Sequence, residues 1–157
     1  MSTLHMLIGP SGSGKSTISK ILKQRENTVI YSWDALRLEM YDKEYSTAFK
    51  MSCEDKEFNS KVMNIYYDLI NHGKNIVIDN VNLTPKSRNK FLNYAKQNDY
   101  YTIGVLFDVP VNILIERQIT RPDKTISERV VREQFDRLIL PSDDEFDLII
   151  NSSSIII

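Results

Sequence analysis

The chain of 157 residues is poor in cysteine and histidine, with one cysteine and two histidines. One cysteine excludes an intramolecular disulfide, and so few thiol and imidazole groups exclude a zinc site built from them. An excess of charge of one sign is also lacking, because 20 basic residues face 21 acidic ones and the net charge is −1. A polyanionic partner would therefore need a local basic patch.

Long apolar runs are absent too. No stretch approaches the roughly 20 apolar residues that a membrane-spanning helix needs, and residues 1–8 lack the basic start and the cleavage site of a signal peptide. The sequence therefore predicts a cytoplasmic protein without a membrane partner. With 41% apolar residues, the length suits a single domain over residues 1–157 that buries its own core.

Short apolar runs alternate with helical patterns along the chain. We expect strands at residues 4–8, 28–31, 75–79, 101–107 and 146–150. Helical spacing of apolar residues predicts helices from the end of a glycine-rich segment to about residue 24, and at 55–71, 85–97, 111–118 and 127–138. This βαβ alternation predicts an α/β fold, an open, mostly parallel sheet with helices on both faces, whose ligands gather at the carboxyl ends of the strands.

The glycine-rich segment after the first predicted strand fits the Walker A pattern G-x-x-x-x-G-K-[ST] from Gly9 to Ser16. Its glycines let backbone N–H groups point at phosphate oxygens, and the following helix adds its positive end. Lys15 would bring charge to the β and γ phosphates, and the Ser16 hydroxyl would ligate Mg²⁺. We expect ATP and Mg²⁺ to bind at Gly9, Ser11, Gly12, Ser13, Gly14, Lys15, Ser16 and Thr17.

An acidic residue follows the third predicted strand. Asp79 is the candidate to hold the magnesium ion or its waters from a neighbouring strand end. The alternative is that Asp79 only caps the loop before Thr84.

The segment after the second predicted strand reads S-x-D-x-x-R, with Ser32, Asp34 and Arg37. At the start of a helix, Asp34 and Arg37 share one side, so the carboxylate could accept a proton from an attacking hydroxyl while the guanidinium holds a phosphate. The alternative is an ordinary helix cap followed by a surface ion pair. Nearby rings, Trp33 and Tyr45 among them, could stack on a base or could simply be core residues.

These motifs, in this order, resemble the kinase domain of the phage polynucleotide 5′-kinases. The likeness continues in residues 79–85, which read DNVNLTP, and in residues 107–110, which read FDVP and precede a helix with Arg117 and Arg121. The resemblance implies a P-loop kinase fold with a helical lid at about residues 117–126. If a phage encodes the protein, the resemblance places it in the cytoplasm of the host. A phage enzyme of this family also carries a phosphatase domain with a D-x-D-x-T motif. Residues 1–157 lack that motif, so we expect no 3′-end-healing activity from them.

The resemblance also implies roles for individual residues. Asp34 would be the general base, Arg37 would hold the acceptor's 3′ phosphate, and Asn82 would help to shape the acceptor pocket. Lys15 with the lid arginines Arg117 and Arg121 would oppose charge on the transferring phosphoryl group. Ser32 and Asp79 would also line the substrate site.

The activity that this resemblance implies is transfer of the γ-phosphate of ATP to the 5′-hydroxyl of a DNA or RNA end, as in nucleic acid repair. Two alternatives remain open at this point, since the same loop also serves other kinases. One is a kinase of a hydroxymethylated base in DNA, and the other is a kinase of a small molecule such as a nucleoside, nucleotide or sugar.

Overall fold

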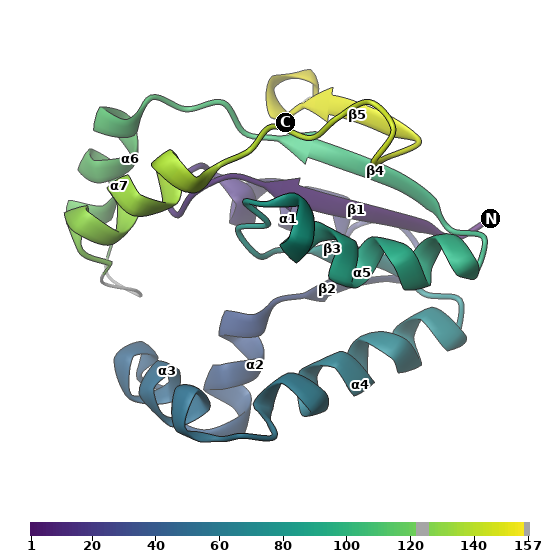
Figure 1. The fold of residues 1–157 in the computed structure, drawn as a ribbon, viewed down its shortest axis with the longest axis horizontal. Helices are drawn as coiled ribbons and strands as arrows, with labels where there is room; N and C mark the ends of the chain where they lie inside the picture. Colours follow the sequence, from purple (N-terminus) through teal and green to yellow (C-terminus); the bar gives the residue numbers. More distant parts are fainter. Residues whose placement is uncertain (122–125, 156–157) are drawn as a thin grey trace.

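The computed structural model of the protein describes residues 1–121 and 126–155. Its five strands form one sheet in the order β2-β3-β1-β4-β5, and every neighbouring pair is parallel (Figure 1). The strands are β1 Thr3–Ile8, β2 Thr28–Tyr31, β3 Asn75–Ile78, β4 Tyr101–Leu106 and β5 Leu148–Asn151. β1 is the central strand, and its residues from Leu4 to Ile8 are buried because both faces of the sheet are covered.

Helices connect these strands. They are α1 Lys15–Leu22, α2 Trp33–Met40, α3 Tyr45–Glu54, α4 Phe58–Asn71, α5 Pro85–Gln97, α6 Val111–Ile119 and α7 Glu128–Arg137, with a short 3₁₀ turn η1 at Ser152–Ser154. The predicted α/β fold with a parallel sheet is confirmed. β2 has the predicted bounds, and α5 begins at Pro85 after a Thr84 cap whose hydroxyl accepts from the Ser87 N–H.

Two expectations about the helices were wrong. The sequence predicts no helix directly before residue 55, but residues 45–54 form α3, which Glu44 caps by accepting from the N–H groups of Ser46 and Thr47. α4 begins at Phe58 instead of residue 55, because Asp55 is the extended residue that ends α3.

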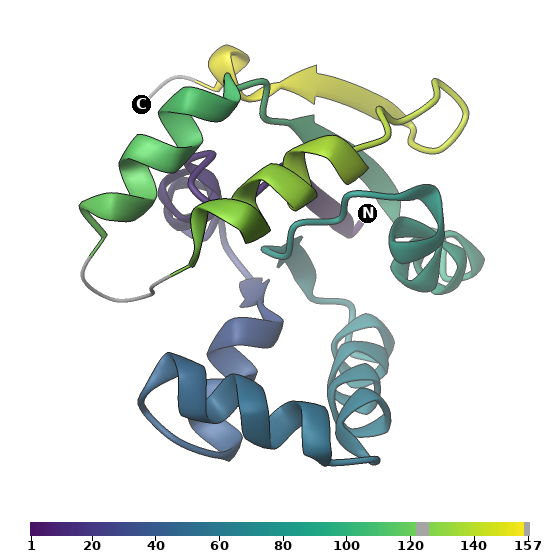
Figure 2. The ribbon, with the colours of Figure 1, turned by 60° about the vertical axis from the view of Figure 1, so that its left-hand side comes forward.

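The two faces of the sheet are covered by different helices. On one face, α4 and α5 pack against β1 and β3 through rings such as Tyr66 and Phe91. On the other face, Ile18 and Leu22 of α1 share a buried cluster with Leu7 of β1, Val77 of β3, and Ile103 and Val105 of β4. Figure 2 shows α2 and α3 below the sheet, with α7 crossing in front of it. The carboxyl ends of β1, β2 and β3 therefore open toward α2, α3 and α7.

A buried ion pair joins α5 to the turn before β5. Arg88 is fully buried; its Nε lies 2.8 Å from Glu145 Oε1, and its Nη1 donates to the Asn82 carbonyl at 3.0 Å. Burial alone would raise the pKa of Glu145, but hydrogen bonds from Arg88 and the Ser142 N–H outweigh it and hold the pKa below its ordinary value. Arg88 therefore fixes the loop after β3 to the rest of the fold.

Replacing this arginine should destabilise the protein. Arg88→Met leaves Glu145 and the Asn82 carbonyl without their partner, so we expect the free energy of unfolding, measured with urea near pH 7, to fall by about 3 kcal/mol. Because the pKa of Glu145 is lowered in the folded state, the stabilisation is present above the carboxylate's ordinary pKa and is lost as pH falls through the lowered value. The difference in free energy of unfolding between the native protein and Arg88→Met should therefore become smaller at acid pH.

The control is Lys86→Met, at an exposed position of the same helix. It should change the free energy of unfolding by no more than about 0.5 kcal/mol. An equally small change for Arg88→Met would contradict a stabilising role for the pair.

Within the described ranges 1–121 and 126–155, no helix is both long and apolar enough to cross a membrane.

Candidate functional site

The loop between β1 and α1 has the backbone that its glycines allow. Gly12 and Gly14 have φ values of 88° and 95°, in the left-handed region that disfavours other residues. Gly9 has a different reason to be glycine, since a Cβ there would lie 2.9 Å from the Phe107 Cβ. The curled loop therefore surrounds the amino end of α1, where a phosphate would be held by N–H groups and by the helix dipole.

Lys15 is folded back over this loop. Its side chain is buried, and its Nζ donates hydrogen bonds to the carbonyls of Gly9 and Pro10, both at 2.8 Å. The ammonium group is thus held at the rim of the loop, close to where an anion on the loop would sit.

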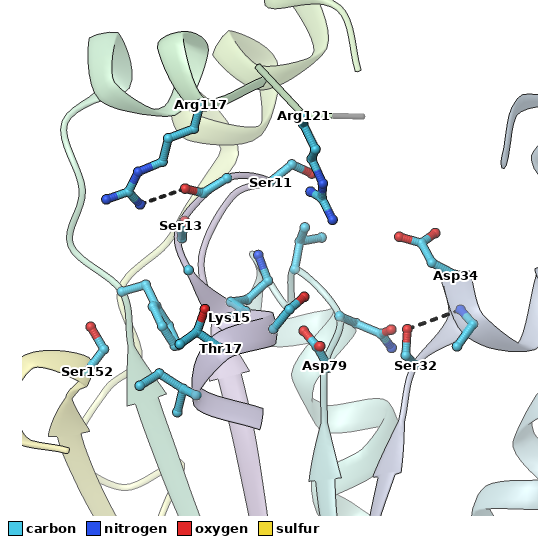
Figure 3. A pocket seen from close by; sticks show the side chains of 18 of the residues that line it. Ser11, Ser13, Lys15, Thr17, Ser32, Asp34, Asp79, Arg117, Arg121 and Ser152 are labelled. Carbon is cyan, nitrogen blue, oxygen red and sulfur yellow. Dashed lines mark hydrogen bonds between the residues drawn. The ribbon is translucent and has the colours of Figure 1, made fainter. Parts of the chain in front are cut away.

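A cavity of about 980 Å³ opens above the loop (Figure 3). Most of the predicted nucleotide and catalytic residues line it: Ser11, Gly12, Ser13, Gly14, Lys15, Ser16, Thr17, Ser32, Asp34, Asp79, Arg117 and Arg121. Three predicted residues, Gly9, Arg37 and Asn82, are not among the described residues that line it. A volume of this size suits a nucleotide together with part of an acceptor.

The donor set for a magnesium ion is small. Ser16 and Asp79 both line the cavity, and Asp79 Oδ2 accepts a hydrogen bond from the Ser19 hydroxyl at 3.2 Å. Over the described part of the chain, no group of three or more histidine, cysteine or acidic residues could hold a metal by itself. One carboxylate and one hydroxyl fit Mg²⁺ bound together with phosphates and waters, because Mg²⁺ rarely uses a cage made only of protein.

A second cavity of about 310 Å³ adjoins the first. Asp34 lines both cavities, whereas Arg37 and Asn82 line only the second. The second cavity also has aromatic walls, formed by Trp33, Phe49 and Phe91. The predicted base therefore lies where the cavity of the glycine-rich loop meets a smaller, partly aromatic cavity.

Asp34 and Arg37 form the ion pair that their spacing predicts. Arg37 Nη1 lies 2.8 Å from Asp34 Oδ1, and Arg37 Nε donates to the Ser52 hydroxyl at 2.9 Å. The guanidinium carbon also lies 5.0 Å and 5.1 Å from the ring centroids of Phe49 and Phe58. These contacts orient the carboxylate of Asp34, and α3 supplies two of them.

The side chain of Ser32 binds the backbone at the start of α2. Its hydroxyl accepts a hydrogen bond from the Ala35 N–H at 3.2 Å, so Ser32 caps α2 while it lines the larger cavity. The cap fixes the first turn of α2, on which Asp34 lies.

Tyr45, the first residue of α3, lines both cavities. Burial, followed by the nearby Asp34 carboxylate, raises the pKa of Tyr45 to about 12 against the opposing charges of Arg37 and Arg121. Tyr45 is therefore neutral at physiological pH and cannot serve as the base. The sequence predicted either a ring that stacks on a base or a core residue, and did not indicate the place of Tyr45 beside Asp34.

The residues missed on α3 had a signal in the sequence. Tyr45, Phe49 and Ser52 are spaced i, i+4, i+7, which places them on one side of a helix. The segment is amphipathic but weakly apolar, so its apolar pattern was too weak to predict the helix.

Asn82 is a buried residue that stabilises the loop after β3. It is buried, adopts a φ of 51°, and its Nδ2 donates to the Leu7 carbonyl at 2.7 Å. The Val81 carbonyl beside it accepts from the Gly9 N–H at 3.0 Å. Asn82 thus shapes the second cavity by holding this loop against the end of β1.

The two predicted lid arginines differ in their contacts. Arg117 Nη1 donates to the Gly12 carbonyl at 2.8 Å, whereas Arg121 points from above into the larger cavity (Figure 3). Part of the predicted lid, residues 122–125, lies outside the described residues. From α7, Gln134 Oε1 accepts from the Ser11 N–H at 2.8 Å, a contact that no local sequence pattern predicts.

Gln118 on α6 lies against the glycine-rich loop. It is buried, and a Cβ on Gly12 would lie 3.2 Å from its Nε2. Among the described residues, neither polar atom of its amide has a hydrogen-bond partner. A buried amide without partners lowers stability.

We therefore expect Gln118→Met, which keeps the length of the side chain, to raise the free energy of unfolding by about 1 kcal/mol in urea titrations. Gln97→Met, at an exposed position on α5, is the matched control and should have little effect. A clear loss of stability for Gln118→Met would mean that the amide is hydrogen-bonded in solution.

Comparison with known proteins gives both a family and relatives. The family model described as AAA domain matches residues 4–140. A protein of Autographa californica nuclear polyhedrosis virus, described as a bifunctional polynucleotide kinase/RNA ligase, is 25% identical over 153 residues. The match covers 91% of this chain and 22% of that protein, so the chain spans about a fifth of its relative's length.

Two solved structures have similar folds. A chain in the structure of the Pnkp1/Rnl/Hen1 RNA repair complex has a TM-score of 0.71 at 20% identity, over 87% of this chain and 44% of that one. A gluconokinase from Sinorhizobium meliloti 1021 has a TM-score of 0.64 at 17% identity, over 98% of this chain and 83% of that one. At these identities the two structures support the fold, which is that of P-loop kinases.

Proposed function

We propose that this chain, which belongs to the AAA domain family, transfers the γ-phosphate of ATP to the 5′-hydroxyl of a DNA or RNA end. The observation that carries this proposal is the position of Asp34 in the lining of both cavities. A donor on the glycine-rich loop and an acceptor in the smaller cavity would meet at this carboxylate. The polynucleotide kinase in the name of the viral relative supports the choice of acceptor.

In this proposal the donor lies along the loop. N–H groups of residues 14–16 and the Lys15 ammonium hold its phosphates, since the Ser11 N–H already donates to Gln134, and Arg121 points toward the same space (Figure 3). Mg²⁺, held by Ser16 and Asp79 with the phosphates, would neutralise charge that develops during the transfer. Arg117 would have to leave the Gly12 carbonyl before it could also reach a phosphate.

The acceptor lies in the smaller cavity with its 5′-hydroxyl at Asp34. The hydroxyl oxygen forms a bond to the γ phosphorus, the bond from that phosphorus to the β–γ bridging oxygen breaks, and the hydroxyl proton passes to the Asp34 carboxylate. ADP leaves with the bridging oxygen. Arg37, already bonded to Asp34, has further N–H groups for the phosphate on the 3′ side of the accepting nucleoside.

A small-molecule kinase is the second candidate, and the fold shared with a gluconokinase favours it. Such an enzyme could use the same loop and the same base. The aromatic walls of the smaller cavity favour a nucleoside over a sugar acid, because a ring can stack on a base.

One assay separates these candidates. The protein is incubated with γ-labelled ATP and 5′-hydroxyl oligonucleotides of DNA and RNA, hydroxymethylated DNA, nucleosides, nucleoside 5′-monophosphates and gluconate. We expect the label on the 5′ ends of oligonucleotides. Faster labelling of gluconate, of nucleosides or of 5′-monophosphates would replace the proposal with the small-molecule kinase, and label on the modified base would assign the hydroxymethyl acceptor.

A further inference from the structure

The smaller cavity carries more positive charge than one acceptor phosphate needs. Its lining includes three cations from three different helices, Arg37 on α2, Lys90 on α5 and Arg137 on α7. Asp34 is the one acidic side chain among the described lining residues. A cavity with this balance favours an anionic ligand.

The three cations are held differently. Arg37 is fixed by Asp34, by Ser52 and by the nearby rings of Phe49 and Phe58, and its side chain is only 14% exposed. It can serve only a phosphate directly beside Asp34. Lys90 and Arg137 are exposed, so their long side chains can reach a phosphate further from the reacting hydroxyl.

Lys90 lies over a fixed ring. Its Nζ is 4.9 Å from the centroid of the Trp33 ring. That ring is anchored, because Trp33 Nε1 donates to the Tyr31 hydroxyl at 3.0 Å and the ring meets Phe58 and Phe91 edge-on. An exposed contact between a cation and a ring contributes less than a charged hydrogen bond to phosphate. A base that stacks on Trp33 would therefore displace Lys90 toward a phosphate.

Arg137 reaches the cavity from the opposite helix. It lies three residues after Gln134, whose amide oxygen accepts from the Ser11 N–H and so fixes α7 on the glycine-rich loop. Residues three apart share one side of a helix, and both of these residues line the smaller cavity. The guanidinium is thus presented across the cavity from α5.

We infer that Lys90 and Arg137 form a second phosphate site, which binds the second phosphate of an acceptor strand. This inference rests on the proposed function, because it assumes that the smaller cavity holds the accepting nucleoside. It makes the preferred acceptor a strand of two or more nucleotides, and it assigns to α5 and α7 the recognition of a polynucleotide.

The single tryptophan of the chain provides a direct measurement of binding. Trp33 fluorescence is titrated, without ATP, with the 5′-hydroxyl dinucleotides d(TpT) and d(TpTp), which have the same bases and differ by one phosphate. We expect d(TpTp) to bind about tenfold more tightly to the native protein. Lys90→Ala and Arg137→Ala should each remove most of this gain. Each should also reduce the slope of log K against log salt for d(TpTp) by about 0.7.

Two variants are matched controls. Lys86→Ala removes an exposed cation of α5, and Arg132→Ala removes one of α7; neither residue lines the smaller cavity. Both should keep the full gain and the full salt slope. The corresponding uridine dinucleotides, with and without the second phosphate, are titrated in parallel. Tighter binding of the dinucleotide with the second phosphate, in either the thymidine or the uridine series, supports the second phosphate site.

A native protein that binds the two dinucleotides equally in both series, or Lys90 and Arg137 variants that keep the gain, would overturn the second site. The proposed function fails by another result, the absence of ATP-dependent phosphorylation of d(TpT) and of its uridine counterpart. A protein that phosphorylates these dinucleotides and ignores the second phosphate therefore retains the proposed function and loses only this inference.

Discussion

Lys15→Met should reduce kcat by a factor of about 10²–10³ while the fold persists. The native side chain holds two loop carbonyls through its Nζ, at 2.8 Å each, so the ammonium is kept at the rim of the glycine-rich loop. During transfer it would oppose negative charge that develops on the phosphoryl group. Methionine fills nearly the same space and removes this charge, so the loss should appear in the rate of the chemical step.

The measurement is the initial rate of label transfer from ATP to a 5′-hydroxyl oligonucleotide at saturating substrates. Lys20→Met, which removes an exposed charge from the same helix, is the control and should leave kcat near the native value. Circular dichroism checks that the Lys15 variant is folded. If a folded Lys15→Met protein turned over at the native rate, the glycine-rich loop would not be the donor site.

The geometry of the glycine-rich loop could be predicted from the sequence because it depends on the backbone. Glycine at residues 12 and 14 permits positive φ values, and a helix begins at Lys15 immediately afterwards. The pattern specifies this local geometry with little help from the rest of the fold. Asp79 was predictable for a similar reason, since it directly follows a buried strand adjacent to β1.

The lining of the smaller cavity, the proposed acceptor site, was less predictable because it is assembled from distant segments. Asp34 and Arg37 are three residues apart, so their pairing was foreseen. The partner of Arg37 on the other side, Ser52, lies on a helix that was not predicted at all. Gln134 reaches the loop from 123 residues away, and no local pattern indicates such a contact.

Asn82 illustrates an intermediate case. Its position in the loop after β3 was assigned to the acceptor pocket, and it does line the smaller cavity. Its amide, however, is bonded to the carbonyl of Leu7, 75 residues earlier. Parallel pairing of β1 with β3 brings these residues together, and that pairing is a property of the whole sheet.

Asp34→Asn should lower kcat by a factor of about 10²–10⁴ and leave the KM of the acceptor nearly unchanged. The amide oxygen of asparagine can still accept the hydrogen bond from Arg37, which is 2.8 Å long in the native protein, so the first turn of α2 should stay as it is. The amide cannot take the proton of the attacking hydroxyl. Tyr45 cannot replace it, because a pKa of about 12 keeps that phenol protonated.

Steady-state kinetics with a 5′-hydroxyl oligonucleotide measures both kcat and the acceptor KM. Two further variants on α2 are compared with Asp34→Asn. Glu39→Gln makes the same chemical change at an exposed position and should change neither constant. Arg37→Ala should raise the acceptor KM by roughly tenfold or more, because it removes charged hydrogen bonds to a phosphate, and it should lower kcat somewhat, because Asp34 loses its partner. Asp34→Asn with a kcat close to native would show that this carboxylate is not the base, and the meeting point of the two cavities would then have to be explained by binding alone.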